Sequence, residues 1–265
     1  MKDCEQIKKY LKGEFEKDFI DACMRNLGDV GNPLRLSNFS YSLRELLREV
    51  LSDRAPDERV RNCEWFIPDI RSKNGITRKH RVKYSIQGGL PDRLLNNKML
   101  KLVADAETSV QKQNNRLNEF THITKDVLYG KKDIEALSET ALTIFFNLLK
   151  SIEEARYSFG LMVTSRVMDK LYLEKVLSDA YRMIEGIPTQ HDLNGFGITE
   201  VLIQEISDSI IRFYTYGVIY ISPLNDQLMA IPYNSTLESK IPDSIDSLEL
   251  QICEFNVNAD EAERF

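Results

Sequence analysis

Arg116 and His122 are the two residues whose types and spacing best suit chemistry in this chain. Histidine has an ordinary pKa near neutrality, so its imidazole can give or take a proton at physiological pH. The planar guanidinium of arginine presents a fork of donors that suits an anion. Their ordinary structural roles are a salt bridge for the arginine and a surface position for the histidine. His191, beside Asp192 and a glycine-rich loop, is a second candidate, and its ordinary role is in a turn.

The spacing of apolar residues predicts one long helix over residues 96–129, which carries both Arg116 and His122. Phe120 and Val127 lie within about 40° of Arg116 around such a helix, which predicts that Arg116 is on the apolar face. A buried arginine needs an anion, an ionic partner or water. His122 lies about 120° from Arg116 and about 9 Å along the axis. The two side chains would therefore meet only through a helix break or across a two-fold dimer interface.

The charge distribution contains one strongly basic stretch in an otherwise acidic chain, whose net charge is −6. Residues 70–91 contain no acid, and their cationic or titratable side chains are Arg71, Lys73, Arg78, Lys79, His80, Arg81 and Lys83. Such a stretch is typical of a confined site for a polyanion. The alternative is a solvated loop whose charges pair with acids elsewhere. Acids dominate from residue 235 to the end, and the segment 243–263 could shield the basic site at rest.

Composition excludes several classes of protein. The apolar fraction is 42% and the charged fraction 29%, which excludes disorder over the whole length. The charged N-terminal segment and the absence of an apolar run long enough for a bilayer predict a cytosolic protein that is not inserted in a membrane. The four cysteines are too widely spaced for a zinc site, so we expect free thiols, no metal and no cofactor.

The usual motifs of P-loop NTPases, Rossmann oxidoreductases, serine hydrolases and zinc proteases are also absent from the sequence. A metal-dependent nuclease would need converging carboxylates and a lysine. The nearest cluster is Asp57 and Glu58, with Glu64 and Asp69 further along. It lacks the Asp…Glu-x-Lys pattern of a strand-borne nuclease core, so this class remains an alternative.

Most of the chain has helical periodicity, which predicts a mainly α protein, an up-and-down helical bundle with a small C-terminal antiparallel β element. Beyond the long helix, we expect a hairpin of 218–222 with 228–232, a third strand over 248–257, and helices over residues 5–26, 41–51, 77–86, 134–156, 164–184 and 198–216. For residues 198–216 the β-branched content fits a strand as the alternative, and the apolar spacing favours the helix. The predicted domains are 1–197, the bundle with the basic segment 70–91, and 198–265, a helix with the β element and the acidic segment.

The Arg-x5-His pattern in a helical bundle resembles the HEPN superfamily of ribonucleases, whose motif is Arg-x(4 to 6)-His and whose site forms at a dimer interface. Other phrases resemble the predicted nucleases associated with prokaryotic PIWI-type conflict systems, over roughly residues 37–130. These phrases are LRELLREVL at 43–51, APDE at 55–58 and KYSIQGGL at 83–90. HEPN enzymes usually have a polar residue directly after the arginine. Here that residue is Leu117, which leaves Asn118 or Asn115 as substitutes.

The resemblance implies a metal-independent endoribonuclease of prokaryotic antiviral defence that uses the ribose 2′-hydroxyl as nucleophile. It implies that His122 is the general acid or base, that Arg116 stabilises the phosphate charge, and that Asn118 assists. The basic stretch would hold the RNA backbone, with Trp65 or Tyr84 stacking on a base. The expected partners are RNA and either a second copy or a larger defence complex. A non-catalytic adaptor or sensor in such a complex is the alternative of a different class.

Overall fold

The computed structural model describes residues 4–121, 131–171, 191–223, 229–258, 261 and 263–264. In chain order, its helices and strands are α1 (Cys4–Lys8), α2 (Glu14–Gly28), α3 (Arg35–Arg54), α4 (Asp57–Arg61), α5 (Arg78–Gln87), the 3-10 helix η1 (Asp92–Leu94), α6 (Asn97–Thr121), α7 (Lys131–Leu171), β1 (His191–Ile206), β2 (Ile210–Pro223), β3 (Met229–Lys240), η3 (Ile245–Ser247), β4 (Gln251–Val257) and β5 (Glu263–Arg264). The protein is therefore mainly helical, with a C-terminal antiparallel sheet, as the sequence predicts.

The chain divides into two compact units, the first formed by residues 1–88 and 96–155 and the second by residues 89–95 and 156–265. The boundary that the sequence suggests, at residue 197, falls within β1, whereas the first unit already ends inside α7. The division into 1–197 and 198–265 stays a prediction.

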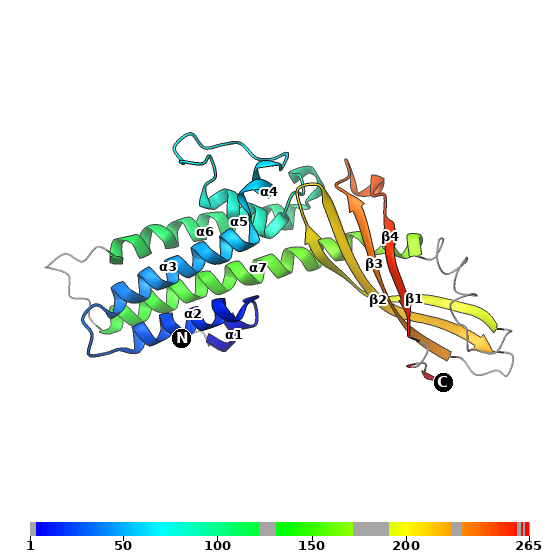
Figure 1. Cartoon of the computed structure of the whole chain (residues 1–265), viewed down its shortest axis with the longest axis horizontal. Coiled ribbons are helices and arrows are strands. Elements are labelled where there is room, and N and C mark those ends of the chain that lie inside the picture. Colours follow the sequence, from blue (N-terminus) through cyan, green and yellow to red (C-terminus); the bar gives the residue numbers. More distant parts are fainter. Residues whose placement is uncertain are drawn as a thin grey trace. The chain divides into compact units, whose positions relative to one another are not determined.

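The first unit is built around α3, which contacts α2, α5 and α6 (Figure 1). The buried residues of α3 recur every three or four positions, so one face of the helix enters the core. Phe39, Leu43 and Leu46 are at most 1% exposed. Helix α5 begins where the sequence places it, because Thr77 accepts a hydrogen bond from the backbone N–H of His80 and caps the helix.

The second unit contains a sheet in the order β1-β2-β3-β4, with β5 also pairing with β3. All of its pairs are antiparallel. The hairpin and the strand over 248–257 that the sequence predicts correspond to β2, β3 and β4. Gly160 of α7 lies so close to β1 that a Cβ there would be 2.4 Å from the carbonyl oxygen of Val201. This close approach explains a glycine inside a long helix.

The helix predicted over 198–216 is wrong, because these residues form most of β1 and the first half of β2. In β2 every second residue is buried, namely Ile211, Phe213, Thr215, Gly217 and Ile219. A strand places alternate side chains on opposite faces, so this period of two is that of a strand packed on one face. Two of the buried positions are not large apolar residues, which hid the alternation in the sequence.

Two helix boundaries predicted from the sequence are also wrong. The helix expected over 5–26 is split into α1 and α2, and Gly13 is the residue before the second of them. The helices expected over 134–156 and 164–184 are joined in α7, because nothing between Arg156 and Thr164 ends the helix and Gly160 is accommodated by the contact with β1. The end of the second of these helices lies outside the described residues, as does the end of the predicted long helix.

Candidate functional site

Arg116 is exposed on α6, so the prediction that it lies on the apolar face is wrong. The buried face of this part of α6 carries Val110, Gln113 and Leu117, with Leu117 only 3% exposed. Arg116 precedes Leu117 by one residue, which turns it about 100° away from that face. Its side chain instead borders an apolar cavity of about 190 Å³ between α6 and α7, lined also by Phe120 and Ile144.

Asn118 faces the opposite way from Arg116 and is held by α3. Its Oδ1 accepts a hydrogen bond of 3.0 Å from Nη1 of Arg44, a residue 74 positions earlier in the chain. Two positions along a helix correspond to about 200°, which separates Asn118 from Arg116. His122 lies outside the described residues, and so does the side chain of His191. The structure therefore does not test the predicted pairing of Arg116 with His122.

Arg44 is a candidate site residue that no sequence pattern singles out. The Arg44 guanidinium lies 5.3 Å from the ring centroid of Tyr41 and 3.5 Å from Oε1 of Glu45. With the bond to Asn118, these contacts fix the position of the guanidinium. The sequence offers no sign that distinguishes Arg44 from Arg48, because both lie on the polar side of one amphipathic helix.

Arg78, the first residue of α5, is the member of the basic stretch that lies close to Arg44. Burial lowers the pKa of the Arg78 guanidinium, the charge of Arg44 lowers this pKa further, and Glu45 opposes the change. Within the described part of the chain, Arg78 has no carboxylate at ion-pair distance. Glu45 is the acid shared by this group, and it also accepts a 2.9 Å hydrogen bond from Nε of Arg48. We call Arg44, Arg78, Glu45 and Asn118 the arginine cluster.

Two other arginines of the basic stretch are paired with acids that precede it in the sequence. Arg71 donates to both carboxylate oxygens of Asp69, at 3.2 and 3.1 Å, and Arg81 donates to Asp57 and to the carbonyl oxygen of Ala55. The Arg71 hydrogen bonds lower the pKa of Asp69. The carboxylates of Asp57 and Asp69 are thus paired with arginines. This pairing argues against the metal-dependent nuclease site that the sequence suggests as an alternative for these acids.

His80 and Lys83 have structural contacts in this region. The backbone N–H of Thr77 donates to Nδ1 of His80, completing a capping box at the start of α5. Burial lowers the pKa of the His80 imidazole. Lys83 lies 5.0 Å from the ring centroid of Trp65, a cation–π contact. Lys73 and Lys79 are exposed.

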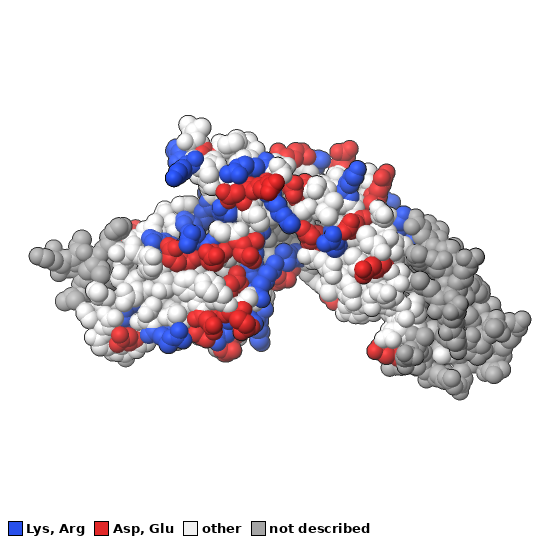
Figure 2. Space-filling model, viewed as in Figure 1, with Lys and Arg blue, Asp and Glu red and all other residues white. Residues whose placement is uncertain are grey.

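The charges on one face of the protein are largely interspersed (Figure 2). On the face drawn in Figure 2, basic and acidic side chains form small neighbouring patches. Asp243 and Asp246 of the acidic segment pair within the second unit, with Arg93 at 3.5 Å and Arg166 at 2.6 Å. These pairs occupy two of the acids proposed to shield the basic site.

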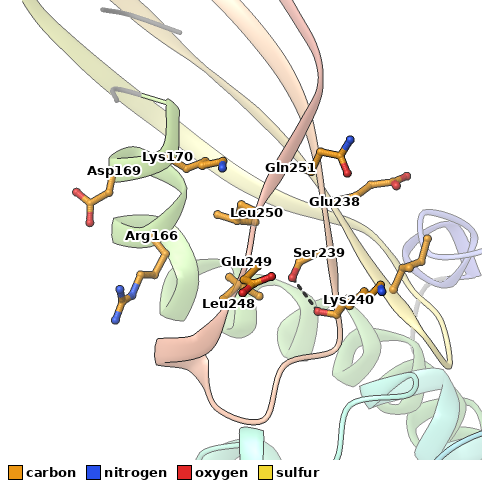
Figure 3. A pocket seen from close by; sticks show the side chains of 11 residues that line it. Arg166, Asp169, Lys170, Glu238, Ser239, Lys240, Leu248, Glu249, Leu250 and Gln251 are labelled. Atoms are coloured by element: carbon orange, nitrogen blue, oxygen red, sulfur yellow. Dashed lines mark hydrogen bonds between the residues drawn. The ribbon is translucent and has the colours of Figure 1, made fainter. Parts of the chain in front are cut away.

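The second unit has its own cavity of about 720 Å³ between the end of α7 and the strands β3 and β4 (Figure 3). Lys170 points from α7 toward the strands. The charged residues that line the cavity are three bases and three acids, namely Arg166, Lys170, Lys240, Asp169, Glu238 and Glu249. Such a balance of charge gives the cavity little preference for a polyanion.

Within the described ranges, no group of three or more His, Cys, Asp or Glu side chains could hold a metal ion. Among the helices of those same ranges, none is long and apolar enough to cross a membrane.

Comparison with known proteins gives one match. Residues 8–145 match a family model described as "Predicted pPIWI-associating nuclease". This range includes all of the arginine cluster and Arg116. Neither curated proteins nor solved structures give a match to the chain.

Proposed function

Since the chain belongs to the family of predicted pPIWI-associating nucleases, we propose that it is an endoribonuclease of a prokaryotic antiviral defence system. The proposal includes cleavage without a metal ion. The observation that carries it is the coincidence of two features within the matched range. One is Arg116, an exposed guanidinium with no ionic partner among the described residues, six positions before His122. The other is the net positive arginine cluster.

The proposed reaction is an internal transfer at one phosphate of RNA. The ribose 2′-hydroxyl attacks the adjacent phosphorus, its proton passes to His122, and the bond to the 5′-oxygen of the next nucleotide breaks. The leaving oxygen takes a proton, and the products are a 2′,3′-cyclic phosphate and a 5′-hydroxyl. Arg116 stabilises the charge that develops on the phosphate oxygens. DNA lacks the 2′-hydroxyl and is not a substrate for this route.

Asn118 and the basic stretch have binding roles in this proposal. Because the Oδ1 atom of Asn118 accepts from Arg44, its amide N–H groups remain as donors toward a phosphate. The backbone of the RNA follows the basic stretch, in which Arg78 is a half-buried arginine without an ion pair among the described residues. A second copy of the chain, or a larger complex of the pPIWI-type system, completes the site.

The test is cleavage of end-labelled single-stranded RNA by the purified protein, in EDTA and in magnesium. We expect cutting in EDTA, and we expect His122→Ala and Arg116→Ala to abolish it. Lys101→Ala is the matched control, because Lys101 is an exposed base on α6 about 22 Å along the axis from Arg116. DNA of the same sequence should remain intact.

Other outcomes point to the other classes of function. Cutting that requires magnesium would contradict the metal-independent route. Cutting that survives His122→Ala would contradict the role of the histidine. Binding of RNA with no cleavage, in the presence of a folded protein, would favour an adaptor.

A further inference from the structure

Three helices bring two arginines and one amide together at the arginine cluster. Arg44 comes from α3, Arg78 from the start of α5 and Asn118 from α6. The Arg44 side chain is 25% exposed, so its guanidinium is partly buried and still open to solvent. Arg78 is also half-buried. The cluster is therefore reached from solvent and yet surrounded by protein.

The cluster has more positive than negative charge. Glu45 lies near Arg44, Arg48 and Arg78, while Arg78 has no carboxylate at ion-pair distance within the described ranges. A half-buried guanidinium that has no direct ion pair is costly, since a more distant carboxylate such as Glu45 returns only part of the solvation that it loses. The positive end of the α5 dipole adds to the same local field. An anion bound here would relieve this imbalance.

The geometry also prepares Arg44 to receive such an anion. Asn118 accepts from one nitrogen of the guanidinium, and the ring of Tyr41 lies against the group. The side chain therefore loses little further freedom on binding, which favours affinity. Nη2 also donates to Oε1 of Glu45 over a long 3.5 Å contact, which leaves the other N–H groups of Arg44 as donors. A phosphate accepts from a guanidinium through two oxygens.

We infer that Arg44 and Arg78 together hold one phosphate of the RNA backbone, with Asn118 as the residue that positions Arg44. This inference rests on the proposed function for the identity of the ligand. Among the arginines of the basic stretch it makes Arg78 the principal contact, because Arg71 and Arg81 are already paired with Asp69 and Asp57.

The experiment measures binding of a fluorescent 2′-O-methyl RNA, which cannot be cut through its 2′-oxygen, between 50 and 200 mM salt. We expect Arg78→Gln to lower affinity about tenfold at the lowest salt and to reduce the slope of log K against log salt by about 0.7, one phosphate contact. Arg44→Lys keeps the charge but loses the planar fork, so we expect a loss of affinity with little change in slope.

Arg25→Gln is the matched control, since Arg25 is an exposed arginine on α2 that lies outside the basic stretch. It should bind as the unchanged protein does. The fold of each variant is checked by its thermal unfolding. The inference is overturned if Arg78→Gln leaves both affinity and slope unchanged, if Arg25→Gln has an equal effect, or if the unchanged protein does not bind RNA at 50 mM salt.

The results distinguish a failure of the phosphate site from a failure of the proposed nuclease function. If the modified RNA binds in a manner that depends on Arg78 and unmodified RNA is not cut, the nuclease proposal is wrong and the phosphate site stands. If unmodified RNA is cut and Arg78→Gln binds and cuts normally, the phosphate site is wrong and the nuclease proposal stands.

Discussion

The hydrogen bond between Arg44 and Asn118 can be tested directly by a double-mutant cycle. Arg44→Ala removes this bond, the contact with Tyr41 and the 3.5 Å ion pair with Glu45, whereas Asn118→Ala removes the bond alone. If the contact stabilises the protein, the double variant will be less destabilised than the sum of the two single variants. The difference is the coupling energy of the pair.

The expected coupling follows from the geometry of the contact. A hydrogen bond to a charged group contributes about 1.5–3 kcal/mol when it is well protected from water. The Arg44 side chain is 25% exposed, so water replaces part of the lost interaction. We therefore expect a coupling of about 1 kcal/mol, below the range for protected bonds. The single change Arg44→Ala should cost more than Asn118→Ala, because a cation–π contact adds about 0.5–1 kcal/mol.

Urea unfolding followed by tryptophan fluorescence is the suitable assay. The only tryptophan, Trp65, lies in the first unit and donates from Nε1 to the carbonyl oxygen of Gly88 at 3.1 Å, so its signal reports on the unit that holds the cluster. Arg48→Ala combined with Asn118→Ala is the control cycle, because Arg48 pairs with Glu45 and Glu49 instead. A coupling for Arg44 and Asn118 below about 0.3 kcal/mol, within the error of additivity, would refute the reasoning.

Two further predictions concern stability. Burial lowers the pKa of His80 in the folded state below its ordinary value of about 6.5. The neutral imidazole therefore contributes its full share to the free energy of unfolding above that pH, and this share is lost as pH falls. Urea unfolding between pH 8 and 5 should show the loss of stability, and His80→Gln, which keeps a capping acceptor, should make the loss smaller. A Cβ at Gly89 would lie 2.2 Å from the carbonyl oxygen of Ser207, so Gly89→Ala should destabilise the second unit by about 1–3 kcal/mol in thermal unfolding. Gly28→Ala is the control, because the space around Gly28 is open, and it should not destabilise the protein. Equal effects of the two changes would contradict this account.

The sequence predicts those elements whose signals are local. Helix α5 begins after Thr77 because a threonine cap is readable from the residues beside it. The hairpin of β2 with β3 is also found, since its apolar strands flank a clear turn at 223–226.

Errors arise where tertiary contacts override the local signal. Gly160 reads as a helix breaker and yet remains inside α7, because β1 passes too close for a side chain at that position. The alternation in β2 includes Thr215 and Gly217 on the buried face, so the spacing of apolar residues does not identify the strand, although the β-branched content of the segment fits one. Contacts of this kind join residues far apart in the sequence, and a single sequence does not reveal them.

The arginine cluster shows the same limit in a functional site. Arg78 and Asn118 can be named from the sequence as members of a basic stretch and of a helix near the Arg-x5-His pattern. Their link is Arg44, which lies 74 positions from Asn118 and reads as an ordinary charge on α3. The sequence does not show which acids pair with Arg71 and Arg81, because Asp69 and Asp57 lie outside the acid-free residues 70–91.

The location of excess charge gives a reason to seek nuclease chemistry in the first unit. A polyanion is attracted by positive charge that no local acid cancels. In the 720 Å³ cavity of the second unit, three bases face three acids. Around the arginine cluster, Arg44, Arg48 and Arg78 share Glu45, and of these three arginines only Arg48 reaches the half-exposed Glu49, at 3.9 Å. The matched range, residues 8–145, contains the cluster and ends before the cavity begins at Arg166. The arginine cluster and most of the matched range thus lie in the first unit, which is the part of the chain in which to test for nuclease chemistry.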